Sequence, residues 1–257
     1  MHRFFIPLEW IQPPLVRFQG ATARQIVRVL RLTQGEIVTV LDGSGTEHSV
    51  HLMRVEHERV EGDIIASRPA SGEPRTNLSL YVGMTQRAKF EWILQKGTEL
   101  GVSAFIPVIT SRSLVRETAG DSNKVARWES ILREAAEQSG RGKIPKLLPV
   151  VPFSKALIDG QKGNALCLIP WEKETKGDLK DCLSHLDQSK PAAVAILIGP
   201  EGGFSDDETG QAIKNGWNPI SLGLRILRME TAALVTTALV LYELGEFKPP
   251  TGAATGS

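Results

Sequence analysis

The chain has 257 residues, of which 41% are hydrophobic, and a formal net charge of +1. The length allows one large domain or two smaller ones, and the composition can bury a real core. The near-neutral net charge excludes the overall basic potential that is typical of many nucleic-acid-binding proteins, but it is compatible with a local basic patch.

Cysteine, histidine and hydropathy patterns narrow the class further. Cys167 and Cys182 are too few for a disulfide framework, and neither they nor the five histidines have metal-ligand spacing. We therefore expect no metal ion. The N-terminal residues lack a long apolar segment and a cleavage site, and the chain has no run of roughly 18 apolar residues. We expect a cytoplasmic protein without a membrane span.

Residues 1–72 predict a small module of short strands with one helix. The expected elements are strands at 4–7, 36–41, 49–55 and 59–65 and a helix at 22–32. The sequence Asp42-Gly43-Ser44-Gly45 is a strong hairpin signal between two of these strands. Short strands with one helix indicate a β-barrel-like module. Proline and glycine in the stretch 68–76 then indicate a linker.

Strand-like and helix-like segments alternate after the linker. The expected strands are 78–84, 104–109, 165–169, 192–198 and 219–222, and the expected helices are 88–100, 124–139, 179–186, 206–215 and 231–244. This alternation predicts an α/β domain at 76–247, whose mostly parallel sheet is covered by helices on both faces. Residues 248–257 are rich in Pro, Gly, Ala, Thr and Ser, so we expect a disordered tail.

The first of two glycine-bearing loops follows strand 192–198 and spans 199–203, with the sequence GPEGG. Alone, such a loop is a weak signal, because a tight strand-to-helix turn also needs glycine. Pro200 fixes φ and removes a donor, so this loop is more constrained than a simple reversal. Ser205 and Glu208 then predict a capping box on an acidic helix start. A capped, acidic helix start is a poor phosphate cradle, which favours a neutral or cationic ligand over nucleotides with phosphates.

The second loop runs from Leu222 to Thr231 and mixes apolar residues with Arg225, Arg228 and Glu230. It is either a solvated loop with an ion pair or an apolar surface that wraps an adenine-like ring. Paired loops at the ends of parallel strands are where α/β folds place small-molecule sites. The following helix is apolar nearly all round, so it must be buried in the core or at a subunit interface.

The two loop sequences, GPEGGFS at 199–205 and LGLRILRMETA at 222–232, resemble the RsmE family of RNA methyltransferases within the SPOUT superfamily. Upstream, Glu99-Leu100-Gly101, Trp128 and the segment 134–145 also resemble that family, so the resemblance covers nearly the whole chain. It implies a PUA-like RNA-binding domain, a SPOUT-type Rossmann-like parallel sheet with a deep trefoil knot, and a homodimer. Periodicity alone indicates no knot, because knots are exceptional.

The resemblance also implies a reaction, the transfer of a methyl group from S-adenosylmethionine to N3 of a uridine in 16S ribosomal RNA of the small subunit. The donor is a sulfonium without phosphate, which agrees with the acidic helix start. Carried over by position, the donor contacts are Leu197, Gly199, Pro200, Glu201, Gly203, Leu222, Gly223, Leu224, Ile226, Leu227 and Met229.

Candidate catalytic residues follow from the need to remove the N3 proton, since a buried anion must be paired. Arg228 or Arg225 can stabilise negative charge on the uracil oxygens. Glu230 can accept a proton or orient an arginine. It can equally do no more than complement the dipole of the last helix.

Arginines outside the loops are candidate phosphate contacts, although any one of them can equally be a solvated surface residue. They are Arg3, Arg17, Arg24, Arg28, Arg112 and Arg141. The sequence leaves three alternatives open: a non-catalytic RNA-binding protein, a small-molecule enzyme with a phosphate-free cofactor, and a methyltransferase that acts on another RNA.

Overall fold

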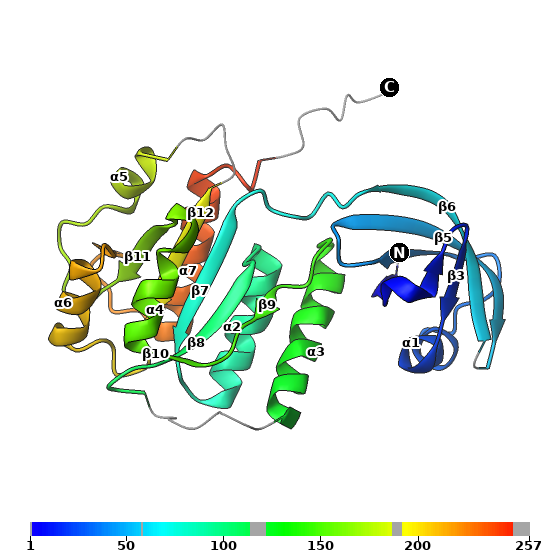
Figure 1. The fold of residues 1–257 in the computed structure, drawn as a ribbon, viewed down its shortest axis with the longest axis horizontal. Coiled ribbons are helices and arrows are strands. Elements are labelled where there is room, and N and C mark those ends of the chain that lie inside the picture. Colours follow the sequence, from blue (N-terminus) through cyan, green and yellow to red (C-terminus); the bar gives the residue numbers. More distant parts are fainter. Residues whose placement is uncertain (1, 58, 114–121, 187–191, 249–257) are drawn as a thin grey trace. The chain divides into compact units, whose positions relative to one another are not determined.

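The computed structural model describes residues 2–57, 59–113, 122–186 and 192–248 (Figure 1). The chain forms two compact units, which are Met1–Glu73 with Arg133–Ile144 and Pro74–Leu132 with Pro145–Ser257. The division after Glu73 falls beside the boundary expected from composition, but the sequence did not indicate that Arg133–Ile144 belongs to the first unit. Except for Lys248, the predicted disordered tail lies outside the described residues.

The first unit is built on a six-stranded sheet with the order β1-β4-β5-β6-β3-β2. Its strands are β1 (Arg3–Phe5), β2 (Ile11–Gln12), β3 (Leu15–Phe18), β4 (Ile37–Leu41), β5 (Thr46–Glu56) and β6 (Arg59–Pro69). β1 and β4 are parallel, and the other neighbours are antiparallel. Alternate side chains of the strands form an apolar core around Phe18, Val38 and Val50, each at most 1% exposed.

The predicted hairpin between β4 and β5 is confirmed. Gly43 and Gly45 have φ of +80° and +103°, and the Asp42 carboxylate accepts a hydrogen bond from the Ser44 N–H at 2.8 Å. These positive φ values are turn conformations that residues other than glycine rarely adopt.

Two predictions for this unit are wrong in detail. The helix expected at 22–32 is a short α-helix, α1 (Gly20–Arg24), followed by a π-helix, η2 (Gln25–Val29). The linker was expected to begin at residue 68, but Arg68 and Pro69 still belong to β6 and pair with Glu47 and Thr46 of β5. The ion pair from Arg68 Nε to Glu47, at 2.6 Å, holds this extension in the sheet.

Two side chains of the segment Arg133–Ile144 form hydrogen bonds with the backbone of Phe5 in β1. The Glu137 carboxylate accepts the Phe5 N–H at 2.8 Å, and Arg133 Nη1 donates to the Phe5 carbonyl at 3.0 Å. These contacts saturate both backbone groups of Phe5, which explains why this segment is part of the unit.

The second unit has a seven-stranded, wholly parallel sheet with the order β10-β8-β7-β12-β11-β13, and β9 pairs with β8. Its strands are β7 (Asn77–Gly83), β8 (Ala104–Ile109), β9 (Lys146–Leu147), β10 (Val151–Pro152), β11 (Leu166–Pro170), β12 (Ala193–Ile198) and β13 (Asn218–Ile220). Its helices are α2 (Arg87–Leu100), α4 (Phe153–Gly160), α5 (Leu179–Ser184), α6 (Asp206–Lys214) and α7 (Met229–Glu243), and α3 (Ser122–Ser139) begins here and ends in the first unit.

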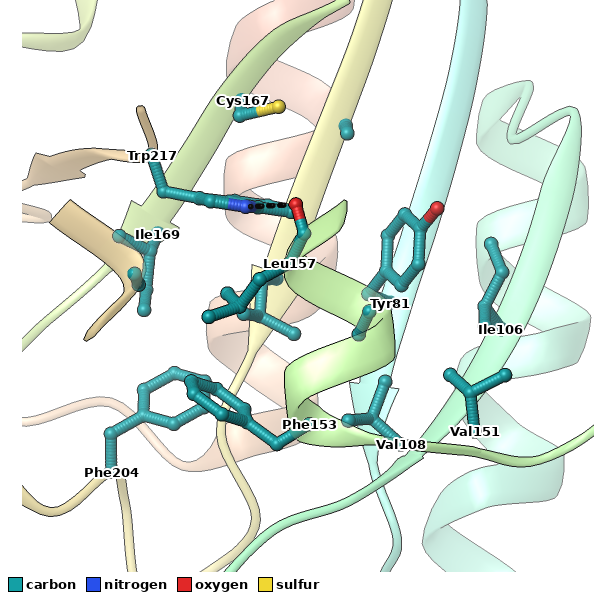
Figure 2. Packing of buried hydrophobic residues seen from close by; sticks show 14 of the residues in the cluster. Tyr81, Ile106, Val108, Val151, Phe153, Leu157, Cys167, Ile169, Phe204 and Trp217 are labelled. Atoms are coloured by element: carbon teal, nitrogen blue, oxygen red, sulfur yellow. Dashed lines mark hydrogen bonds between the residues drawn. The ribbon is translucent and has the colours of Figure 1, made fainter. Parts of the chain in front are cut away.

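Helices cover both faces of this sheet, as the alternating pattern predicted. α4 packs on one face against Tyr81, Ile106 and Val108, and α7 lies on the other (Figure 2). The indole N–H of Trp217 donates to the Leu157 carbonyl of α4 at 3.1 Å. Gly160 is needed there, because a Cβ would come within 2.3 Å of the Trp217 ring.

The sequence missed α4, β9 and β10, and it missed the short strands β2 and β3. β2, β9 and β10 have two residues each and α4 has eight, which is shorter than the windows in which periodicity can be recognised, and β3 has only four residues. In the described part of the chain, no helix is both long enough and apolar enough to cross a membrane.

Candidate active site

A pocket of about 430 Å³ lies at the carboxyl ends of β11, β12 and β13. Both glycine-bearing loops line it, as the sequence predicted, because loops that follow neighbouring parallel strands meet at one edge of a sheet. All the predicted donor contacts except Leu197 and Leu224 belong to its wall, and so do Arg225, Arg228 and Glu230. Leu197 is fully buried in the core and Leu224 is fully exposed, so the structure brings neither to the pocket.

A third stretch of the wall was missed from the sequence. Pro170 ends β11, and Trp171 and Glu172 follow it. β11 lies between β12 and β13 in the sheet. The strand itself was predicted, but its neighbours in the sheet were not, and only that order brings its end between the two loops. Lys89, in the first turn of α2, also lines the pocket and was not predicted.

Backbone packing fixes the first loop. The Gly203 N–H donates to the Pro200 carbonyl at 2.9 Å, and Gly203 has φ of +65°. A Cβ on Gly83, at the end of β7, would come within 2.5 Å of the Pro200 nitrogen. Arg112, from the loop after β8, donates to the Gly202 carbonyl at 2.8 Å. The loop is therefore held in shape by protein contacts on several sides.

Glu201 is the charged residue of this loop and is held by two donors. Its Oε1 accepts hydrogen bonds from the Thr85 hydroxyl and, at 3.1 Å, from Lys89 Nζ. Burial raises the pKa of Glu201, but the hydrogen bonds from Thr85, from its own backbone and from Lys89 outweigh burial and leave the pKa lowered. The carboxylate is therefore charged at neutral pH.

The predicted capping box at the start of α6 is confirmed. Ser205 accepts the Glu208 N–H, and Glu208 accepts the Ser205 N–H at 3.0 Å. Asp206 and Asp207 complete an acidic first turn. This helix start is capped and negative, so its geometry supports the expected exclusion of a phosphate group.

The second loop presents apolar and basic side chains together. Ile226 is 87% exposed while Met229 is buried. Arg225 and Arg228 are exposed, and Arg228 is the N-cap residue of α7 without a side-chain capping hydrogen bond. Within the described residues, no ion pair joins either arginine to Glu230. Both guanidinium groups are thus available to a ligand.

Three residues of the wall carry buried polar atoms without a hydrogen-bond partner in the described structure. They are Trp171 (Nε1), Glu201 (Oε2) and Glu230 (Oε2). Such atoms are costly to leave unpaired, and three of the six in the described part of the chain lie around this one pocket. The arrangement is typical of a binding site.

The predicted phosphate contacts differ in their environments. Arg24 and Arg28 are exposed on α1 and η2 of the first unit. Arg3 pairs with Glu47 at 2.8 Å, and Arg17 lies 3.5 Å from Glu61. Arg112 is engaged with the first loop, as described above.

Arg141 is the exception among these arginines. It is 2% exposed and forms an ion pair with Glu73 at 2.6 Å. Glu73 also accepts the N–H groups of Gly142 and Lys143. This arginine was expected at the surface, but burial gives it a structural role, so we no longer regard it as a phosphate contact.

Comparison with known proteins agrees with the geometry of the site. Residues 72–241 match the family described as RNA methyltransferase domain. The chain is 32% identical over 249 residues to ribosomal RNA small subunit methyltransferase E of Bacillus subtilis, covering 95% of this chain and 97% of that protein. The protein of the same name from Synechocystis is 32% identical over 243 residues, covering 93% and 77%.

Solved structures show the same relationship. The Neisseria gonorrhoeae ribosomal RNA small subunit methyltransferase E, bound to S-adenosylmethionine, superposes with a TM-score of 0.84 at 32% identity, covering 96% of this chain and 99% of that one. A methyltransferase from Legionella pneumophila in complex with the same cofactor gives 0.82 at 30% identity, covering 93% and 96%. The chain therefore belongs to the ribosomal RNA small subunit methyltransferase E family of RNA methyltransferases.

Proposed function

We propose that this protein methylates N3 of a uridine in 16S ribosomal RNA of the small subunit, with S-adenosylmethionine as the methyl donor. The observation that carries the proposal is the pocket in which both family loops meet beside a capped, acidic helix start. A sulfonium ligand without phosphate suits that electrostatic setting. The names of the relatives and the donor bound in two of their structures support methyl transfer from this donor to small-subunit ribosomal RNA. The N3-uridine position rests on the resemblance of the two loop sequences to the RsmE family.

The donor pocket would be formed by the backbone of the first loop and the apolar side chains of the second. Gly199, Glu201 and Gly203 offer backbone groups, and Leu227 and Met229 offer apolar surface for an adenine ring. When bound, S-adenosylmethionine supplies a methyl group on a positively charged sulfur. Trp171 and Glu172 add hydrogen-bonding groups that the sequence did not indicate.

Side chains of the protein must remove the proton from uridine N3 and stabilise the resulting anion. As that proton leaves, negative charge develops on the uracil oxygens, and Arg228 or Arg225 would stabilise it with planar N–H donors. Glu230 would accept the proton or orient an arginine. Because an arginine beside the sulfonium would be repelled, we assign Arg228 to the base.

The remaining parts of the proposal concern RNA and assembly. The first unit would act as a PUA-like, barrel-shaped RNA-binding domain, with Arg17, Arg24 and Arg28 as phosphate contacts. The second unit would be a SPOUT domain with a deep trefoil knot that dimerises through α7. The protein would act in the cytoplasm, where ribosomal RNA is processed. The exposure of Arg24 and Arg28 and the apolar sequence of α7 support these assignments.

Mass-spectrometric mapping of ribosomal RNA modifications tests the proposal directly. RNA from cells without the protein should lack one N3-methyluridine in 16S ribosomal RNA, and adding the protein and donor should restore it. Stoichiometric donor binding without methyl transfer to this RNA would indicate another RNA substrate. No donor binding at all would favour the non-catalytic RNA-binding alternative.

A further inference from the structure

Lys89 reaches the pocket from the first turn of α2, outside both loop motifs. Its Nζ lies 3.1 Å from Glu201 Oε1, and its side chain is 31% exposed. A lysine ammonium has three N–H donors. Glu201 is the single partner that the described structure gives Lys89, so donors remain for a group in the pocket.

The position of Lys89 is electrostatically unfavourable for the helix alone. The first turn of a helix carries a partial positive charge, which repels a lysine. The N-cap residue of α2, Gln86, makes no side-chain capping hydrogen bond. The neighbouring Arg87 pairs with Glu91 at 2.7 Å, so Lys89 is the cation of this turn that lines the pocket. α6 has the opposite character, because it is capped and acidic. A basic, uncapped helix start beside the pocket indicates that an anionic group belongs there.

The charges of the pocket wall show why a ligand with a carboxylate would need such a cation. Glu172, Glu201 and Glu230 all line the pocket, and they would repel a further carboxylate. Arg225 and Arg228 are exposed on the second loop. Lys89, in contrast, is held in one place by its ion pair with Glu201, which belongs to the first loop.

We propose that Lys89 binds the α-carboxylate at the methionyl end of the methyl donor and thereby sets the specificity of the pocket for a complete donor. The inference rests on the proposed function, because it takes S-adenosylmethionine as the ligand. Lys89 would then touch the donor itself. It would discriminate between ligands that have an amino-acid end and ligands that lack it.

Isothermal titration calorimetry with two ligands tests this assignment. S-adenosylhomocysteine and 5′-methylthioadenosine share the adenosine and a neutral sulfur, but the second lacks the amino-acid end. Lys89→Met should weaken S-adenosylhomocysteine binding roughly tenfold or more, as expected for one lost charge-assisted hydrogen bond. It should leave the affinity for 5′-methylthioadenosine nearly unchanged. Equal losses for both ligands, or no loss for either, would overturn the proposal.

Three further variants separate a direct contact from an effect through Glu201. Thr85→Val removes the other donor to Glu201 Oε1 but keeps the ammonium, so it should not discriminate between the ligands. Lys89→Arg keeps the charge and should retain most of the preference for S-adenosylhomocysteine. Lys96→Met removes a lysine of the same helix that pairs with Glu99 at 2.8 Å, and it should behave as the unmodified protein. If Thr85→Val reproduced the ligand discrimination of Lys89→Met, Lys89 would act through Glu201 and the proposal would be wrong.

The unmodified protein distinguishes failure of this inference from failure of the proposed function. If it binds neither ligand, the proposed donor is wrong and the role of Lys89 falls with it. If it binds S-adenosylhomocysteine tightly and Lys89→Met binds equally well, the donor stands and the role of Lys89 alone is refuted. Thermal unfolding of each variant confirms that the fold is retained.

Discussion

Glu208, in the first turn of α6, accepts hydrogen bonds from both the N–H and the hydroxyl of Ser111, at 2.7 and 2.8 Å. Ser111 follows β8, whereas Glu208 belongs to the capping box behind the first loop. One carboxylate therefore caps α6 and ties two loops together. Since Arg112 beside Ser111 holds the Gly202 carbonyl, this small network supports the pocket wall.

We predict that Glu208→Gln lowers the free energy of unfolding by about 1–2 kcal/mol at pH 7, because it weakens a cap and two charge-assisted hydrogen bonds. Burial raises the pKa of Glu208, but its hydrogen bonds with Ser111 and Ser205 outweigh burial and leave the pKa lowered. The carboxylate therefore stabilises the fold above pH 4.5, its ordinary value, and loses this effect as the pH falls through the lowered pKa. Chemical unfolding of both proteins at pH 7 and pH 3 should show the difference shrinking in acid. A difference independent of pH would contradict this account.

Gly203→Val should abolish donor binding and leave most of the fold intact. Gly203 has φ of +65°, which a β-branched residue rarely adopts, and its Cβ would lie 3.3 Å from Glu172 Oε1 in the pocket wall. Calorimetry with S-adenosylmethionine measures the effect. Gly210→Val is the matched control, because a Cβ at Gly210 of α6 meets nothing within 4 Å. Unchanged affinity in Gly203→Val would mean that the loop has a structural role only.

Arg228→Ala should lower kcat on the order of 10²-fold or more while donor affinity hardly changes, because the arginine acts on the developing uracil anion. Raising the pH should partly rescue the rate, since uridine then ionises without help. Arg228→Lys should recover little if two planar contacts are needed. Single-turnover kinetics and donor titration measure the two effects separately. Weakened donor binding with an unchanged kcat would move Arg228 to the donor half of the site.

Arg141→Met should destabilise the protein by roughly 3–5 kcal/mol, because it leaves the Glu73 carboxylate without its buried partner. RNA affinity of the molecules that remain folded should be unaffected at low temperature. Arg28→Ala should show the reverse, with weaker RNA binding and unchanged stability, since Arg28 is exposed. Denaturant unfolding and filter binding at fixed salt give both quantities. If the Arg141→Met protein were folded but bound RNA more weakly, Arg141 would be a phosphate contact after all.

We expect a homodimer that buries part of α7. This helix is apolar nearly all round, and Leu239 and Tyr242 remain 43% and 67% exposed in the single chain. Light scattering at micromolar concentration should give twice the monomer mass of 28.1 kDa. Leu239→Asp should shift the population towards the monomer. A 28.1 kDa species at all concentrations of the unmodified protein would refute the dimer.

Much of the second unit was predictable because its strands and helices are long enough for their periods to be recognised. β8 has the predicted ends, 104–109, and α2 begins one residue before its predicted start and ends at Leu100, as predicted. The capping box on α6 was readable because its two partners are three residues apart in the sequence. Local sequence signals of this kind predict the structure correctly when tertiary contacts favour the same local conformation.

The features that were missed depend on contacts between residues far apart in the chain. Lys89 belongs to the pocket only because Glu201 lies next to α2, and Trp171 belongs to it only because β11 lies between β12 and β13. Arg141 resembled a surface arginine until Glu73, 68 residues away, was placed beside it. A single sequence contains no record of such pairings, so charge and composition alone assigned these residues incorrectly or not at all.

The close approach of Gly83 to Pro200 has a consequence for how the sequence can vary. Any side chain at position 83 would collide with the backbone of the first loop, at 2.5 Å from the Pro200 nitrogen. Because that atom belongs to the main chain, no change of rotamer can relieve the collision. In a saturation-mutagenesis screen selected for methylation, position 83 should therefore tolerate as few substitutions as the pocket wall, although it lies outside that wall.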